Sequence, residues 1–227
     1  AAFSKWGIEK TLDQINGMFA IALFDRDENV LYLLRDRIGQ KPLYYARFDQ
    51  TILFGSELKA LKKHPQFVAN INRDALAEYS RFCYVPDPLS IYQKTYKLPP
   101  GHFIRIHIDE SVVTDPICYW DHQAIIHSQE NTFLGTFEEA EEGLHRLLLD
   151  AVETRMLSDV PLGAFLSGGI DSSLIVALMQ AQSKDPIKTF TIGFNQQAFN
   201  EAEEAKSVAH YLGTEHAELY VSPEKAQ

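Results

Sequence analysis

Glycines and hydroxyl side chains are concentrated in one segment of the chain, Phe165-Leu-Ser-Gly-Gly-Ile-Asp-Ser-Ser173. The adjacent glycines allow a tight turn with accessible backbone N–H groups, and the serines add hydroxyl donors. An apolar helix is expected to follow, with its positive dipole end at the same place. Such donors favour an anion, and a carboxylate among them favours a cation that accompanies it. We predict a site for ATP with Mg²⁺ formed by Ser167, Gly168, Gly169, Asp171, Ser172 and Ser173, with Asp171 as a ligand of Mg²⁺.

The specificity of this segment depends on its context. A bare Ser-Gly-Gly is common in strand-to-helix connections, so an ordinary glycine turn with incidental serines is the alternative interpretation. The full segment between an apolar strand and an apolar helix is more specific, because parallel sheets bind nucleotides at such switch regions. The phosphate-loop patterns GxxxxGK[ST] and GxGxxG do not occur in the sequence.

Strands and helices alternate around this segment. The alternation predicts βαβ crossovers and a parallel sheet covered on both faces by helices. In the first helix, one face carries apolar residues, which is typical of a helix that buries that face. These residues are Ala140, Leu144, Leu147, Leu148 and Ala151. The predicted elements are a long helix from the Thr136–Glu139 capping-box pattern, strands at Leu162–Leu166, Lys188–Gly193 and His216–Val221, and helices at Ser172–Ser183 and Glu201–Leu212.

Short strands dominate the first half of the chain. They are predicted to form an antiparallel meander, followed by two helices and a last hairpin around Asp109–Ser111. Asn72 is a plausible N-cap of the second helix. The predicted strands are Met18–Asp25, Val30–Arg35, Leu43–Phe48, Ile52–Ser56, His102–His107 and Val112–Trp120, and the helices are Glu57–Lys63 and Arg73–Phe82.

Composition narrows the class of protein. The chain of 227 residues is 45% hydrophobic and 23% charged, which is typical of a globular protein with one large or two modest domains. A formal net charge of -10 argues against nucleic acid as a partner. Apolar runs fall far short of the roughly 18 residues that span a bilayer, so no membrane partner is expected. Cys83 and Cys118 form neither a disulfide framework nor a metal-binding pair, so a reducing, cytoplasmic location is expected.

The glycine-serine segment resembles the pyrophosphate-binding loop of the ATP-pyrophosphatase superfamily, whose members cleave ATP between its α and β phosphates. Three blocks in the first half resemble the glutaminase domain of glutamine-dependent asparagine synthetases. Two later stretches resemble the exit from that domain and the approach to the ATP loop of the same family. The three blocks are Gly17–Asp25, Arg35–Tyr45 and Phe54–Leu61, and the later stretches are Lys97–His102 and Ser158–Gly163.

The resemblance implies an α+β part followed by an α/β part. The first would be the C-terminal part of an N-terminal-nucleophile glutaminase domain, over residues 1–122. A linker at 123–135 would lead to the first half of a parallel-sheet ATP-pyrophosphatase domain, over 136–227. Because the first residue is not methionine and the last residues begin another element, we expect both ends to be truncations.

The resemblance also implies roles for single residues. Phe165 and Leu166 would flank the nucleotide, Ile192 and Gly193 would contact adenine, and Met18 matches a position that lines an ammonia tunnel. A buried core position is the commoner role for a methionine such as Met18. The set Arg35, Asp36 and Arg37 is read as a structural ion-pair cluster, with direct substrate contact as the alternative.

No catalytic residue is assigned. The family's glutaminase nucleophile is an N-terminal cysteine, which Ala1 cannot replace, and Cys83 and Cys118 match no catalytic position. The family's later synthetase residues have no counterpart in the sequence.

The activity implied is ATP-dependent conversion of aspartate to asparagine with ammonia from glutamine. ATP, aspartate and glutamine would be its small-molecule partners, Mg²⁺ its cofactor, and a homodimer is compatible with the family. Three alternatives stay open: a related amidotransferase acting on a sugar acid or β-amino acid, a non-catalytic nucleotide-binding homologue, and a tRNA-modifying enzyme. The acidic charge and the first half of the chain argue against the last.

Overall fold

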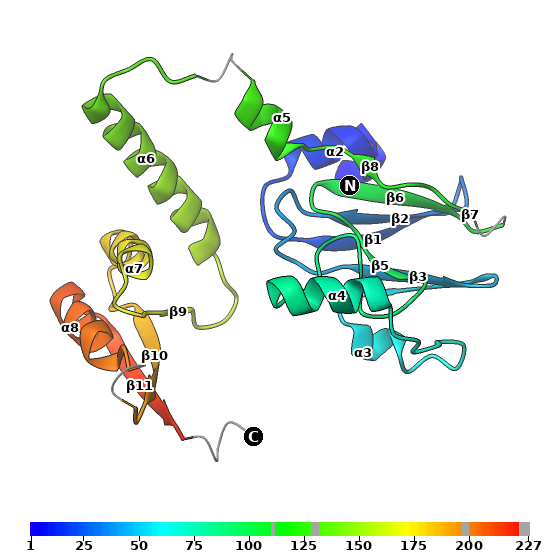
Figure 1. Cartoon of the computed structure of the whole chain (residues 1–227). Helices are drawn as coiled ribbons and strands as arrows, with labels where there is room; N and C mark the ends of the chain where they lie inside the picture. Colours follow the sequence, from blue (N-terminus) through cyan, green and yellow to red (C-terminus); the bar gives the residue numbers. More distant parts are fainter. Residues whose placement is uncertain (110–111, 129–131, 197–199, 223–227) are drawn as a thin grey trace. The chain divides into compact units, whose positions relative to one another are not determined.

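The computed structural model describes residues 1–109, 112–128, 132–196 and 200–222. Contacts divide the chain into two compact units, Ala1–Thr132 and Phe133–Gln227 (Figure 1). Each unit has its own hydrophobic core, so each is described by itself.

Two antiparallel sheets form the centre of the N-terminal unit (Figure 1). The first has the strand order β1-β2-β6-β7, with β8 also paired to β6, and the second has the order β4-β3-β5. Leu33, Ile104 and Ile106 of the first sheet pack with Leu43 and Tyr45 in the layer between the sheets. The strands are β1 (Ala20–Asp25), β2 (Val30–Arg35), β3 (Tyr44–Phe48), β4 (Thr51–Gly55), β5 (Thr95–Lys97), β6 (His102–His107), β7 (Val112–Val113) and β8 (Ile117–Cys118).

Helices cover the outer faces of both sheets. Leu12 of α2 packs against Val30, Leu34 and Phe103 of the first sheet. Leu61 of α3 packs against the second sheet. The helices of this unit are α1 (Ala2–Trp6), α2 (Ile8–Gln14), α3 (Leu58–Leu61), α4 (Arg73–Phe82) and α5 (His122–His127).

The prediction of a single meander is wrong, because β2 and β3 belong to different sheets. β2 pairs with β1 on one side and with β6 on the other, where Leu34 lies opposite Phe103. Five of the six residues of β2 are buried, so the strand needs cover on both of its faces. The second sheet supplies one cover, and the chain passes to it through a turn at Gly39, where φ is 67°.

Side-chain caps explain two helix starts in this unit. Asn72 accepts hydrogen bonds from the N–H groups of Asp74 and Ala75, which confirms the predicted cap and bounds of α4. Asp121 caps α5 in the same way, and this helix occupies the first part of the predicted linker 123–135. Residues 110–111 of the predicted turn and 129–131 of the linker lie outside the described residues. The short elements α1, α2, β5 and α5 were not predicted.

Three parallel strands form the sheet of the C-terminal unit, in the order β11-β10-β9. The capping box between Thr136 and Glu139 starts α6 as predicted. The elements are α6 (Phe137–Met156), β9 (Gly163–Phe165), α7 (Ile170–Gln182), β10 (Lys188–Phe194), α8 (Ala202–Leu212) and β11 (Glu215–Val221).

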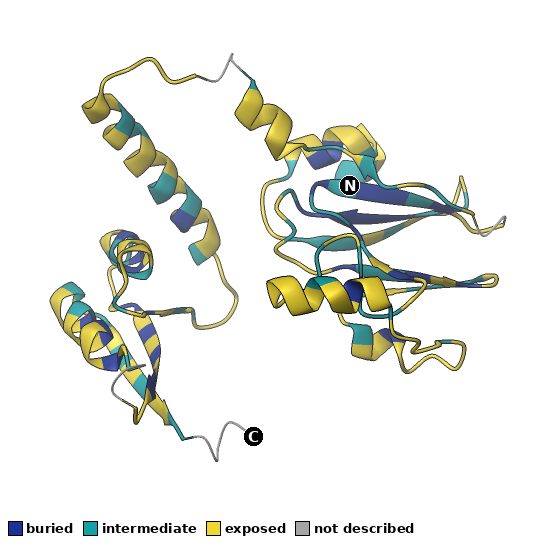
Figure 2. Ribbon diagram, viewed as in Figure 1, coloured by how far each residue is buried: buried dark blue, intermediate teal, exposed yellow. Residues whose placement is uncertain are grey.

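Only one face of this sheet is covered among the described residues, so the prediction of two covered faces is wrong. Along β10 the threonines 189 and 191 are buried, whereas Phe190, Ile192 and Phe194 are 42%, 47% and 42% exposed. This alternation appears as bands along β10 in Figure 2. Within this unit, no described segment covers the face that carries Phe190, Ile192 and Phe194.

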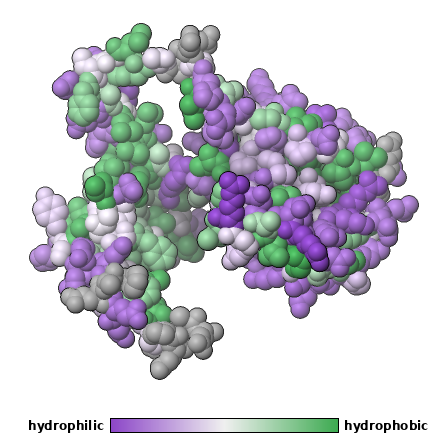
Figure 3. Space-filling view, viewed as in Figure 1, coloured by the Kyte–Doolittle hydropathy of each residue, from purple (hydrophilic) through white to green (hydrophobic). Residues whose placement is uncertain are grey.

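The expected buried face of α6 is also only partly buried. Leu148, Leu149 and Val152 pack with α7, but Leu144 and Leu147 are 58% and 66% exposed. Figure 3 shows apolar side chains along this helix. The helix therefore packs through part of the predicted face, at Leu148, together with the adjacent Leu149 and Val152. In the described part of the chain, every helix is too short or too polar to cross a membrane.

Candidate functional site

The glycine-serine segment lies between the end of β9 and the start of α7. Gly169 is the N-cap residue of α7, and no side chain caps the helix. The first N–H groups of a helix have no partner within the helix, so α7 presents uncapped donors at this point. In the next helix upstream, α6, the N–H of Glu139 is instead capped by the Thr136 side chain. The start of α7 therefore suits an anion.

Hydrogen bonds within the segment hold it in a compact turn. The hydroxyls of Ser167 and Ser172 lie 2.9 Å apart. The Ser172 hydroxyl oxygen accepts the Ser167 N–H at 3.2 Å, and the Ser167 oxygen accepts the Gly169 N–H at 3.4 Å. Ser173 differs, because its hydroxyl is buried and has no partner among the described residues. The structure thus brings Ser167, Gly169 and Ser172 together around donors that an anion's oxygens could accept.

The two glycines have different reasons to be glycine. Gly168 has φ of 77°, and a Cβ there would lie 2.8 Å from Cβ of Glu204 and 3.0 Å from the backbone nitrogen of Ala205. Gly169 has an ordinary φ of -71°, and its Cβ would meet only the Ser167 hydroxyl, at 3.4 Å. The start of α8 therefore packs directly on Gly168, and Gly168 alone is sterically required.

Asp171 lies exposed in the first turn of α7. Among the described residues, no group of three or more His, Cys, Asp or Glu side chains could hold a metal ion. Magnesium is commonly held by one or two carboxylates together with substrate phosphates and water. A single carboxylate beside a phosphate site fits that arrangement, whereas a metal cage made by the protein alone does not.

The four predicted adenine-side residues are divided between the two faces of the sheet. Phe165 and Ile192 lie on the uncovered face and are 77% and 47% exposed. Leu166 is buried in the core beneath α7 and α8. Gly193 lies on the covered face, opposite Tyr220 of β11. The four therefore share the carboxyl edge of the sheet, and backbone atoms are what they can offer jointly to one ligand.

Aromatic rings lie over two glycines of this sheet. A Cβ on Gly193 would come within 2.7 Å of the Tyr220 ring, and a Cβ on Gly163 would collide with the ring of Phe190. Tyr220 donates a hydrogen bond to Glu218 at 3.0 Å, which lowers the pKa of that carboxyl. Each glycine thus provides the space that a neighbouring ring fills.

Two residues that the sequence did not single out hold this edge of the sheet. The Thr191 hydroxyl donates to the carbonyl of Leu166, the residue immediately before Ser167. The Asn200 side chain accepts the N–H groups of Phe194 and Ala202, at 3.2 and 3.3 Å, and so joins β10 to α8. The sequence did hold a signal for Thr191. A threonine hydroxyl in a strand that is expected to be buried needs a hydrogen-bond partner.

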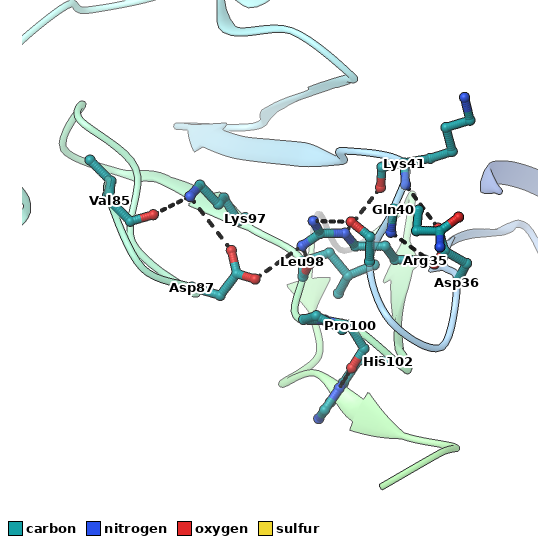
Figure 4. Close-up of polar contacts among 11 residues, drawn as sticks. Arg35, Asp36, Gln40, Lys41, Val85, Asp87, Lys97, Leu98, Pro100 and His102 are labelled. Carbon is teal, nitrogen blue, oxygen red and sulfur yellow. Dashed lines mark hydrogen bonds and ion pairs between the residues drawn. The ribbon is translucent and has the colours of Figure 1, made fainter. Parts of the chain in front are cut away.

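The Arg35–Asp36 cluster of the N-terminal unit is the second group of polar residues that the sequence singled out (Figure 4). Arg35 is 7% exposed and donates to the carbonyls of Leu98, Gly39 and Lys41 at 2.6 to 3.0 Å. Its guanidinium also pairs with Asp87 at 3.3 Å. These contacts all join parts of the protein itself, but the ion pair is with Asp87 and not within the predicted set Arg35, Asp36 and Arg37. Arg37 donates to the Asp13 carbonyl at 2.7 Å.

Asp36 and Tyr119 extend the cluster. The Asp36 carboxylate, 1% exposed, accepts the N–H groups of Gln40 and Lys41, each at 2.9 Å, and that of Phe19 at 3.3 Å. The Tyr119 hydroxyl donates to the Arg35 carbonyl at 2.7 Å. Burial, reinforced by the Asp36 charge, raises the pKa of Tyr119 to about 12.

The remaining singled-out residues lie at the surface. Met18 is 47% exposed just before β1, so the core position considered for it is wrong. Cys83 and Cys118 are free and exposed. Hollows of about 790 and 640 Å³ lie in the N-terminal unit, and no predicted site residue lines either one.

Two family models match the chain. The glutamine amidotransferase domain model matches residues 1–120. The asparagine synthase model matches residues 143–227, which include the glycine-serine segment.

Curated proteins match the chain over most of its length. It is 34% identical over 217 residues to glutamine-hydrolyzing asparagine synthetase 1 of Bacillus subtilis (strain 168). The matched region is 96% of this chain and 33% of that relative. It is 35% identical over 224 residues to putative glutamine-hydrolyzing asparagine synthetase 2 of Methanocaldococcus jannaschii, over 96% of this chain and 41% of that relative. Glutamine-hydrolyzing asparagine synthetase 3 of Bacillus subtilis is 32% identical over 193 residues, covering 83% and 30%. The chain thus spans 30 to 41% of the length of these relatives.

Proposed function

Because this chain belongs to the family of glutamine-hydrolysing asparagine synthetases, we propose that it is part of an ATP-dependent ligase that converts aspartate to asparagine with ammonia from glutamine. The observation that carries the proposal is the segment from Ser167 to Ser173 at the uncapped start of α7. It occurs in one chain with residues that match the glutamine amidotransferase model. The Ser167–Ser173 segment would bind ATP. The residues that match the glutamine amidotransferase model belong to the half of the protein that would supply ammonia.

The segment would bind the β and γ phosphates of ATP, which leave as pyrophosphate. Phosphate oxygens would accept the N–H groups of Ser167 and Gly169, whose present acceptors are serine hydroxyls. The hydroxyls of Ser167, Ser172 and Ser173 would then donate to the same oxygens. Mg²⁺, held by Asp171 and the phosphates, would neutralise charge when bound.

The proposed reaction has two steps. A side-chain carboxylate oxygen of aspartate attacks the α-phosphorus of ATP, the bond from that phosphorus to the bridging oxygen breaks, and pyrophosphate leaves. Ammonia then attacks the acyl carbon, loses a proton and displaces AMP. The donors at the start of α7 contribute to the first step, because they stabilise the charge that develops on the departing pyrophosphate.

The finer assignments are part of the same proposal. Residues 1–122 would be the C-terminal part of an N-terminal-nucleophile glutaminase domain, and 136–227 the first half of an ATP-pyrophosphatase domain. Support comes from the layers of helix, sheet, sheet and helix in the first unit and from the parallel strands of the second. Phe165, Leu166, Ile192 and Gly193 would surround adenine at the sheet edge, and Met18 would line the ammonia path. A cytoplasmic location and a homodimer stay predictions.

Release of AMP by the full-length gene product tests the proposal. The purified protein would receive glutamine and Mg²⁺-ATP, with and without aspartate, and AMP, pyrophosphate and asparagine would be measured. AMP and asparagine formed in equal amounts only with aspartate would support the proposal. AMP formed only with another carboxylate, such as a sugar acid, would identify a related amidotransferase instead. ATP binding without AMP formation would indicate a non-catalytic homologue.

A further inference from the structure

Leu166, the residue before the phosphate-binding segment Ser167–Ser173, is held to β10 by two different bonds. Its N–H donates to the Phe190 carbonyl at 3.0 Å, which is an ordinary bond of a parallel ladder. Its carbonyl accepts the side-chain hydroxyl of Thr191 at 2.5 Å. Ser167 therefore follows a residue whose N–H and carbonyl are both hydrogen-bonded to β10.

The side-chain bond lies where the ladder stops. Pairing between β9 and β10 ends with Phe165 opposite Phe190. A continued ladder would pair Ser167 with Ile192 and extend the strand into the glycines. The Thr191 hydroxyl binds the Leu166 carbonyl instead, so the chain can leave the sheet at Ser167 without a buried unpaired carbonyl.

Burial gives this bond a fixed geometry. Thr191 is 5% exposed, Leu166 is 2% exposed, and the Leu166 side chain packs with Val176 of α7 and Ala205 of α8. The direction of the Leu166 carbonyl is coupled through the peptide plane to that of the Ser167 N–H, the first donor of the segment. Any movement of this carbonyl therefore redirects that donor.

We propose that Thr191 is a positioning residue of the phosphate-binding segment, acting through the Leu166 carbonyl and not by contact with the nucleotide. This inference rests on the proposed function, because it assumes that the segment binds pyrophosphate. Without the hydroxyl, the carbonyl lacks its donor and the peptide between Leu166 and Ser167 rotates. The donors then lose their alignment toward the phosphates.

The same strand offers a matched control. Thr189 is also buried, at 0% exposure, on the same face of β10, and its hydroxyl binds Thr214 and His216 at 2.9 and 3.0 Å. Thr189 lies near the start of β10, whereas Gly168 and Gly169 lie beyond the other end of the sheet. Thr189→Val thus removes a buried hydroxyl from the same strand without touching the segment.

The experiment compares wild type, Thr191→Val, Thr191→Ser and Thr189→Val in the full-length protein. Binding of Mg²⁺-pyrophosphate and of Mg²⁺-ATP is measured by calorimetry, and thermal unfolding is measured in parallel. We expect Thr191→Val to weaken pyrophosphate binding about tenfold, since small misplacements of binding groups have effects of this size or larger. Thr191→Ser should restore the affinity, and Thr189→Val should lower the unfolding temperature and leave the affinity unchanged.

Each outcome is decisive. Equal pyrophosphate affinity in wild type and Thr191→Val would overturn the inference, as would an equal loss in Thr189→Val, because both results leave Thr191 a purely structural role. Failure of the wild-type protein to bind ATP or pyrophosphate would overturn the proposed function, and this inference with it.

Discussion

Two turns of this protein follow the ends of strands and contain glycine, yet their polar groups have opposite arrangements. After β2, Arg35 and Asp36 are buried, and their contacts are with the protein's own carbonyls, N–H groups and Asp87 (Figure 4). After β9, the serines bond chiefly within their own turn, and Asp171 is exposed. The comparison teaches that a charged motif is not by itself a binding site. Polar groups that are still available to an outside partner distinguish the second turn from the first.

Replacement of Arg35 is the strongest test of this contrast. Arg35→Met should destabilise the N-terminal unit by about 3–5 kcal/mol, because it leaves the carbonyls of Leu98, Gly39 and Lys41 without their donor and removes one of the two cations beside Asp87. Both tryptophans, Trp6 and Trp120, lie in this unit, so urea unfolding followed by tryptophan fluorescence reports on it. Pyrophosphate binding should not change.

The control for that variant is Arg47→Met, on an exposed strand position of the same unit. It should alter stability by no more than about 0.5 kcal/mol. If Arg35→Met abolished ligand binding while the unfolding curve stayed in place, the cluster would be part of a site and the contrast would fail.

Replacement of Asp171 should lower activity and leave stability unchanged, which is the reverse of the effect expected for Arg35. Asp171→Asn should lower the rate of AMP formation roughly 10²–10³-fold, because a charge that helps to hold the metal and the phosphates is lost. The unfolding curve should be unchanged, since Asp171 is exposed. Asp185→Asn, another exposed carboxylate of the same unit, serves as the control. Equal rates for the two variants would remove Asp171 from the site.

The two glycines sharpen the comparison within the second turn. Gly168→Ala should destabilise the packing of α8 on the turn by about 1–3 kcal/mol, since its Cβ has no room. Gly169→Ala should change stability by no more than about 0.5 kcal/mol. Hydrogen exchange of the α8 amides measures both effects. Similar exchange rates in the two variants would show that α8 does not depend on Gly168.

The smallest effect concerns Tyr119, whose pKa burial raises to about 12. The protonated phenol is favoured in the folded state. The pKa of an unfolded tyrosine is about 10. The contribution of Tyr119 to stability is therefore complete below pH 10, and it is lost as the pH rises toward the folded-state pKa of about 12. Tyr119→Phe should remove this part of the pH dependence and cost about 1 kcal/mol at neutral pH, through the lost hydrogen bond.

A difference titration of phenolate absorbance, wild type minus Tyr119→Phe, isolates this group from the other tyrosines. A midpoint near that of a free tyrosine would contradict the burial of Tyr119 in the Arg35 cluster.

Local patterns predicted many elements of the fold closely. The bounds of β2, α4 and β6 agree with the prediction, and so do the caps of α4 and α6. These features depend on neighbours in sequence: an alternation of side chains, a cap three residues from its N–H, a glycine before a helix. The order of strands and helices around Ser167 follows from the same signals.

Features that depend on distant partners were missed. The separation of β2 from β3 depends on β6, which is far along the chain and takes the place beside β2. The exposure of Leu144 depends on which stripe of α6 meets α7, and periodicity alone does not select it. Thr191 was overlooked as a contact of Leu166 because the two residues meet only through the pairing of β9 with β10.

The rings that lie over Gly163 and Gly193 have an evolutionary consequence. A side chain at position 163 would occupy the space of the Phe190 ring, and one at 193 would meet Tyr220. Among related sequences, we therefore expect positions 163 and 190 to change together, and likewise 193 and 220, with a larger residue at the glycine accompanied by loss of the ring. The two positions of each pair would covary, although a helix separates them along the chain.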